Sequence, residues 1–154
     1  MNVMHPPFVH FVVALPLVAL FSQFTYMVTK DMAYSKAALR IIAFSLLLSL
    51  FAVLSGISDA DKIIKSHMII QDGIVVLKNH KIFGFVVVAM LFVTTLVKWF
   101  AVSRDSIKLE NLAIVLIIIT LMGSLYQGKS GGSIVYQYTG GIDSQVIIQR
   151  ASQK

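Results

Sequence analysis

The chain has 154 residues, of which 57% are hydrophobic and only 13% are charged, and its mean hydropathy is +0.83. A soluble domain is about 45–50% apolar and about 25% charged, so this composition excludes a water-soluble globular protein. The net charge of +6 comes from Lys and Arg residues scattered singly between apolar runs, without the basic stripe that binds nucleic acid. The absence of cysteine excludes disulfides, thiolate metal sites and haem attached through cysteine.

Four apolar runs are each long enough to cross the hydrocarbon core of a bilayer. They predict an all-α membrane protein with spans at about residues 8–29, 40–57, 81–102 and 107–127. We therefore expect a four-transmembrane-helix bundle over residues 1–127, embedded in lipid, followed by a Gly-rich tail over residues 128–154. Alternating residues between the glycine pairs of this tail predict a short extended segment, from Ser133 to Tyr138.

An even number of spans places both termini on one side of the membrane, here called side A. Side A also receives the long connection over about residues 57–81, whereas the opposite side, side B, receives two short connections. The short connections are rich in cations, which are Lys30, Lys36, Arg40, Lys98, Arg104 and Lys108. The positive-inside rule then predicts that side B is cytoplasmic, in the inner membrane of the cell, and that the termini are periplasmic or otherwise extracytoplasmic. Lys98 is expected to extend to the interface beside Trp99.

All four histidines, namely His5, His10, His67 and His80, are predicted to lie on side A. Ionisable residues at a membrane boundary mark functional sites by default, because burying them without a partner is costly. His10 is predicted to lie deeper than His5, and His80 is followed one turn later by Gly84 on the same helix face. A glycine at that position allows a flat ligand or another backbone to approach closely.

Four short motifs occur in the chain in a characteristic order. They are HPPFVHF at residues 5–11, GISD at residues 56–59, His80 with Gly84, and GGSIVY at residues 131–136. Together they resemble the HPxxVHFP, GxxD, HxxxG and GGxxVY motifs of a bacterial family of small membrane proteins, catalogued as domain of unknown function 2231. The chain departs from the family pattern after Phe11, where Val12 and Val13 stand and the family usually has proline, and at Tyr138, where the family often has histidine.

The resemblance implies a four-helix fold and a link to haem-based or quinone-linked electron transport through neighbouring proteins. The first hypothesis is a haem b ligated by His10 and His80, with His5 as alternate ligand or propionate partner and Asp59 as an orienting residue. Gly84 would lie against the macrocycle. The chain would then be an electron-transfer subunit or anchor, with a cytochrome, a quinone or another membrane redox subunit as partner.

Two alternatives remain open on the residues alone. A nonhaem metal site would use His5, His10 and His80 with Asp59, and His67 could replace any of these ligands. A structural scaffold would use the same side chains only for hydrogen bonds between helix ends. No nucleophile elbow and no catalytic carboxylate pair is present, so we expect no stand-alone catalytic activity.

Overall fold

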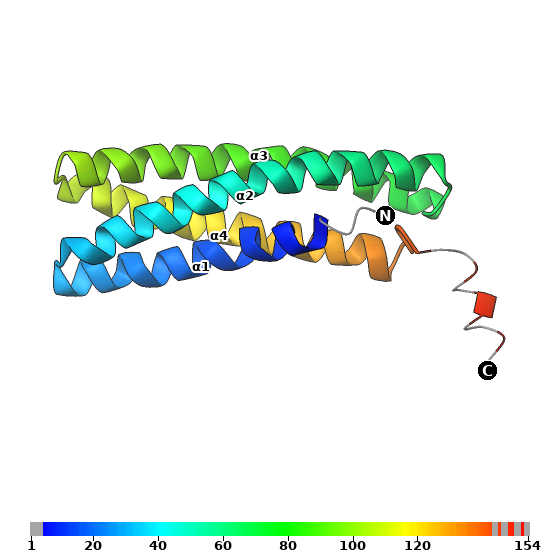
Figure 1. The fold of residues 1–154 in the computed structure, drawn as a ribbon, viewed down its shortest axis with the longest axis horizontal. Coiled ribbons are helices and arrows are strands. Elements are labelled where there is room, and N and C mark those ends of the chain that lie inside the picture. Colours follow the sequence, from blue (N-terminus) through cyan, green and yellow to red (C-terminus); the bar gives the residue numbers. More distant parts are fainter. Residues whose placement is uncertain (1–4, 143–144, 146–147, 150–151, 153–154) are drawn as a thin grey trace.

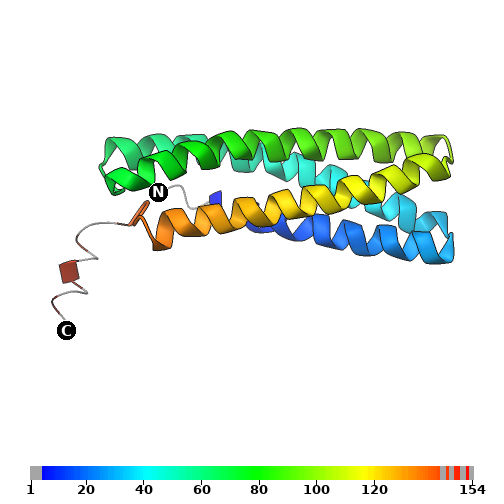
Figure 2. The same ribbon diagram turned by 180° about the vertical axis from the view of Figure 1, so that it is seen from behind.

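A computed structural model describes residues 5–142, 145, 148–149 and 152 of the chain. It contains four α-helices, which are α1 (His5–Thr29), α2 (Met32–Lys65), α3 (Gln71–Ser103) and α4 (Ile107–Tyr136). The helices alternate in direction, and α1 packs on α2 and α4 while α3 packs on the same two neighbours. Figure 1 shows the elongated bundle, in which the start of α1 and the end of α4 lie at the same end. Figure 2 shows from behind how α4 runs beside α1 and α3.

The predicted fold class is confirmed, because all four helices are long and apolar enough to cross a membrane. The bundle has a lipid-facing exterior of large exposed apolar side chains, such as Phe21, Phe24, Leu54, Phe92 and Met122. Its interior is lined by smaller and more polar residues. Ser45, Ser49 and Ala52 of α2 are buried, as expected for a stripe of small residues that lets helices approach closely.

The helices extend well beyond the predicted spans. α2 begins at Met32 and ends at Lys65, and α3 begins at Gln71, so the predicted long side-A connection is wrong and only residues 66–70 separate the two helices. The prediction ended each span at charged residues, but charge limits only the part of a helix that lies in hydrocarbon. Asp31 sets the start of α2, since its side chain accepts a hydrogen bond from the Ala33 N–H at 2.8 Å.

The Gly-rich segment also differs from its prediction. α4 continues to Tyr136, so most of the predicted extended segment is helical. Gly131 has a packing role there, because a Cβ atom would lie 3.2 Å from His80 Cε1. After α4 the chain turns across side A, where Ile70 N–H donates to Tyr138 O at 3.3 Å and Gly141 N–H donates to Met68 O at 3.0 Å. Most of the tail beyond residue 142 lies outside the described residues.

One cluster of buried side chains joins α1, α2 and α3, and it consists of Val12, Ala19, Ile42, Ala52, Val87 and Leu91. Polar groups are buried along the whole bundle: Gln23, Ser35, Lys98 and Glu110 lie near side B, Ser45, Thr94 and Thr120 lie between the ends, and Asp59 lies near side A.

Candidate functional site: a cavity near side A

A cavity of about 180 Å³ lies between the side-A halves of all four helices. Its wall is mostly apolar, and the polar residues in it include His5 of α1, Asp59 of α2, His80 of α3, and Ser124 and Gln127 of α4. Gly140, from the turn after α4, also contributes to the wall. The fold therefore brings two of the four histidines to one cavity from diagonally opposite helices.

His80 and Gln127 form the main polar contact of the cavity wall. The Gln127 Nε2 group donates to the His80 backbone oxygen at 2.9 Å and lies 3.2 Å from His80 Nε2. Because that amide nitrogen is a donor, His80 Nε2 is assigned as the acceptor and the ring proton lies on Nδ1. Gly84 makes room for this contact, since a Cβ atom there would lie 3.1 Å from Gln127 Nε2.

Three polar atoms of residues that line the cavity are buried and have no hydrogen-bond partner among the described residues. They are His80 Nδ1, Gln127 Oε1 and Ser124 Oγ. A buried polar atom without a partner costs about 1–3 kcal/mol, and native proteins leave few of them. A donor and an acceptor that are both unpaired beside one cavity are the chemical pattern of a binding site for a polar group on an apolar ligand.

His5 lies at the start of α1, with Nδ1 3.0 Å from Ala52 O and 3.1 Å from Ser55 Oγ. These two contacts hold the Nδ1 side of the ring against α2, and neither of them involves Nε2. Gly56 provides the space, since a Cβ atom there would lie 2.7 Å from the His5 ring. His5 and His80 both line the cavity.

The other expected site residues have different positions. His10 is exposed and bonds through Nδ1 to Pro6 O at 2.6 Å, within its own helix; it is not in the cavity wall. His67 is exposed in the α2–α3 connection, in a left-handed conformation with φ of 52°. Asp59 is buried and lines the cavity. Across the described part of the chain, no group of three or more His, Cys, Asp or Glu side chains is placed to hold a metal ion.

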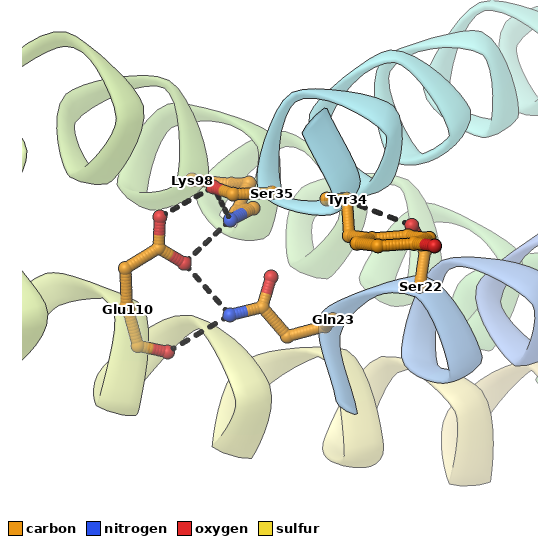
Figure 3. A network of polar contacts seen from close by, with 6 residues as sticks. All are labelled: Ser22, Gln23, Tyr34, Ser35, Lys98 and Glu110. Carbon is orange, nitrogen blue, oxygen red and sulfur yellow. Dashed lines mark hydrogen bonds and ion pairs between the residues drawn. The ribbon is translucent and has the colours of Figure 1, made fainter. Parts of the chain in front are cut away.

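A second polar cluster, near side B, was not predicted. Lys98 and Glu110 are 0% and 1% exposed and form an ion pair with a 2.5 Å N–O distance. The expectation that Lys98 extends to the interface is therefore wrong. The signal was present in the sequence, since Glu110 is the only glutamate of the chain and lies within the predicted fourth span. The sequence did not identify Lys98 as the partner of Glu110, because the two residues lie on different helices (Figure 3).

A family model described as "Predicted membrane protein (DUF2231)" matches residues 2–144. The match covers all four helices and all four short motifs. No curated protein and no solved structure matches the chain significantly.

Proposed function

The chain belongs to the DUF2231 family of predicted membrane proteins, and from its cavity we propose that it is a redox-linked membrane subunit that binds the ring of a quinol or quinone. The observation that carries the proposal is the unpaired donor and acceptor, His80 Nδ1 and Gln127 Oε1, on two residues that line one apolar cavity.

The size of the cavity supports a ligand with a single ring. An apolar cavity of about 150 Å³ is large enough for a benzene molecule, and this one measures about 180 Å³. Its mostly apolar wall favours an uncharged ring, because a charged ligand there would be desolvated without a partner of opposite charge. A lipid-soluble molecule also reaches such a site directly from the bilayer.

The hydrogen-bonding groups distinguish the two redox forms of the ligand. A quinone only accepts hydrogen bonds, so it pairs with the His80 Nδ1–H and with the Ser124 hydroxyl. A quinol in addition donates, and its O–H satisfies Gln127 Oε1. We therefore expect the reduced form to bind more tightly than the oxidised form.

Haem b is the second candidate, and the contact between His5 Nδ1 and Ala52 O favours it. An axial histidine is commonly oriented in this way, with one ring nitrogen on a backbone carbonyl and the other on the metal. His5 and His80 would then be the ligands rather than His10. A porphyrin has four linked pyrrole rings and does not fit the present cavity, so haem binding by this bundle stays a prediction for experiment.

The orientation of the protein is also part of the proposal. We place side B in the cytoplasm and the cavity near the periplasmic face of the inner membrane, as the cations of the two short side-B connections predict. The exposed cations at the side-B helix ends are Lys30, Lys36, Arg40, Arg104 and Lys108, and the described residues at the side-A ends expose an equal number, Lys62, Lys65, Lys78, Lys81 and Lys129. Lys98 is buried and ion-paired, so it is not counted among the exposed cations. Because the chain has no cysteine, single-cysteine labelling tests the orientation cleanly. Ser66→Cys should react with a membrane-impermeant maleimide in intact spheroplasts, and Ser103→Cys only after lysis; the reverse pattern would overturn the orientation.

The ligand is tested by titrating the protein, purified in lipid nanodiscs, with a short-chain benzoquinol under argon and with the matching benzoquinone in air. We expect saturable binding, tighter for the quinol, and a loss of about tenfold or more in affinity for Gln127→Leu and for His80→Leu. His10→Ala is the matched control, because His10 is not in the cavity wall, and its affinity should be unchanged.

Two results would contradict the proposal. One is the absence of saturable binding to folded protein. The other is a reduced-minus-oxidised absorption spectrum with a sharp α band that disappears in the His5→Ala and His80→Ala variants, which would establish haem instead.

A further inference from the structure

The wall of the side-A cavity reaches the outer surface of the bundle between α2 and α3. Phe85 of α3 lines the cavity and is also 50% exposed. Val53 and Ile57 of α2 and Val88 of α3 line the same cavity and are half-buried. Residues three or four apart share one face of a helix, so each helix contributes one pair to this boundary. These four residues are called the α2–α3 seam below.

The other three boundaries between neighbouring helices are bridged by close contacts in the side-A half. Two are bridged by aromatic pairs, which are Phe8 of α1 with Phe51 of α2, at 5.6 Å between ring centroids, and Phe83 of α3 with Tyr126 of α4, at 4.9 Å. At the α1–α4 boundary a Cβ atom on Gly128 would lie 3.3 Å from Val13 Cγ2, so the two helices approach closely there. These contacts leave the α2–α3 seam as the side on which the cavity is nearest to lipid.

The seam lies deeper in the membrane than the end of the cavity at side A. A layer of buried side chains closes that end, and it consists of Ala60, Leu77 and Ile134. Val53 and Phe85 are seven and eight residues from Ala60 and Leu77 along their helices, which corresponds to about 10–12 Å further into the bundle. Val135 of α4 also lines the cavity and is partly exposed, but it adjoins Ile134 in the closing layer. The seam is thus at the depth of lipid hydrocarbon.

We propose that the α2–α3 seam is a lateral opening of the cavity to the bilayer, and that the ligand carries a long hydrocarbon chain which leaves through it. This inference rests on the proposed function, because the ring is the part of the ligand that occupies the cavity. The ligand class is then a quinol or quinone with an alkyl or isoprenoid chain, rather than a water-soluble single ring.

The size of the cavity supports a chain that lies outside it. A cavity of about 150 Å³ holds a benzene molecule, so the present volume of about 180 Å³ holds one ring without a chain in addition. All four side chains of the seam are apolar, and lipid chains are as apolar as such side chains. A chain that exchanges lipid contacts for seam contacts therefore gains or loses little, and the polar atoms of His80 and Gln127 select the ring.

Lys81 marks where the seam meets the headgroups. It lies one turn before Phe85 on α3, lines the cavity and is exposed. A lysine in this position extends its ammonium group to the headgroup region and covers apolar surface with its stem. The opening therefore lies between the Lys81 stem and Val88, where it faces hydrocarbon rather than water.

Photolabelling locates the chain directly. The probe is a benzoquinol with a decyl chain that carries a diazirine near the ring, irradiated under argon with the protein in lipid nanodiscs, and the labelled residues are identified by mass spectrometry. We expect labels on Val53, Ile57, Phe85 and Val88, and suppression of these labels by an excess of the same quinol without its chain. Suppressible labels on Val13 or Val135 instead would overturn the opening and leave ring binding intact. Labels that the chainless quinol does not suppress would contradict ring binding itself.

Val53→Trp and Leu54→Trp give a matched comparison on α2, because Leu54 is 66% exposed and is not in the cavity wall. The measured quantity is the affinity for the decyl quinol divided by the affinity for the chainless quinol. An indole at position 53 fills the seam, so this ratio should fall by about tenfold or more. Leu54→Trp should leave the ratio unchanged. Equal losses of affinity for both ligands in Val53→Trp, or equal ratios in the two variants, would overturn the opening.

Discussion

At side B, buried polar side chains from all four helices pair with one another, and Gln23 Oε1 is left over, whereas at side A one polar atom each of His80, Gln127 and Ser124, residues that line the cavity, is buried without a described partner. Both ends are inside the same bundle and face the same apolar surroundings. The side-B cluster therefore ties the four helices together without help, while the side-A wall is complete only when something else supplies hydrogen bonds. A buried polar group contributes to stability where it is paired and indicates binding where it is not.

The largest effect is expected for Glu110→Gln, which leaves the Lys98 ammonium buried without a counter-charge. Removal of one partner of a buried ion pair costs about 3–5 kcal/mol, measured here as the free energy of unfolding in mixed detergent micelles. The control is the double variant Lys98→Met with Glu110→Leu, which should recover much of the loss because neither charge remains. A single variant as stable as the wild-type protein would show that the side-B pair does not hold the bundle.

The same substitution at the two ends compares them directly. Ser35→Ala should lower the free energy of unfolding by about 1.5–3 kcal/mol, because Ser35 bonds to two charged groups. Ser124→Ala should leave the stability of the ligand-free protein unchanged or raise it, since the Ser124 hydroxyl has no partner among the described residues. Equal losses of unfolding free energy in the two variants would show that the two serine hydroxyls do not differ in how they are paired.

A smaller effect is expected at the contact between α1 and α2. In Gly56→Ala the new Cβ atom would lie 2.7 Å from the His5 ring, so the ring must leave its hydrogen bonds to α2. We expect a loss of about 1 kcal/mol in unfolding free energy and a shifted His5 signal in ¹⁵N-histidine NMR spectra. Gly132→Ala is the matched control, because its Cβ would meet only Tyr136 Cδ2, at 4.0 Å, and alanine favours a helix. An unchanged His5 signal in Gly56→Ala would contradict the close contact between Gly56 and the His5 ring.

The smallest effect is expected for His10→Ala. His10 is exposed and bonds within its own helix, so its removal should change stability by less than about 0.5 kcal/mol. Quinol affinity should also be unchanged. Loss of ligand binding in this variant would instead favour the ligand pair first predicted from the sequence, His10 with His80.

Several features of the fold follow from the sequence directly. Uncharged apolar runs identify the four spans because water-to-hydrocarbon transfer acts on each run by itself. The short motifs led to the family in the same local way. The helix ends could not be predicted in this way, because charged residues such as Arg40 and Lys62 lie within α2. Hydropathy does not show where a helix continues into the headgroup region.

Pairing between helices was decided only by the tertiary structure. Lys98 and Glu110 are twelve residues apart and meet because α3 and α4 form an antiparallel hairpin. His80 and Gln127 meet across the same pair of helices at the other end, with Gly84 providing the room. Gln127 is not among the site residues predicted from the sequence. The sequence by itself determined which segments enter the membrane, because that depends on each segment's own solvation. The tertiary structure set the rotation of each helix about its axis, and this rotation decided which polar groups find partners and which surround a cavity.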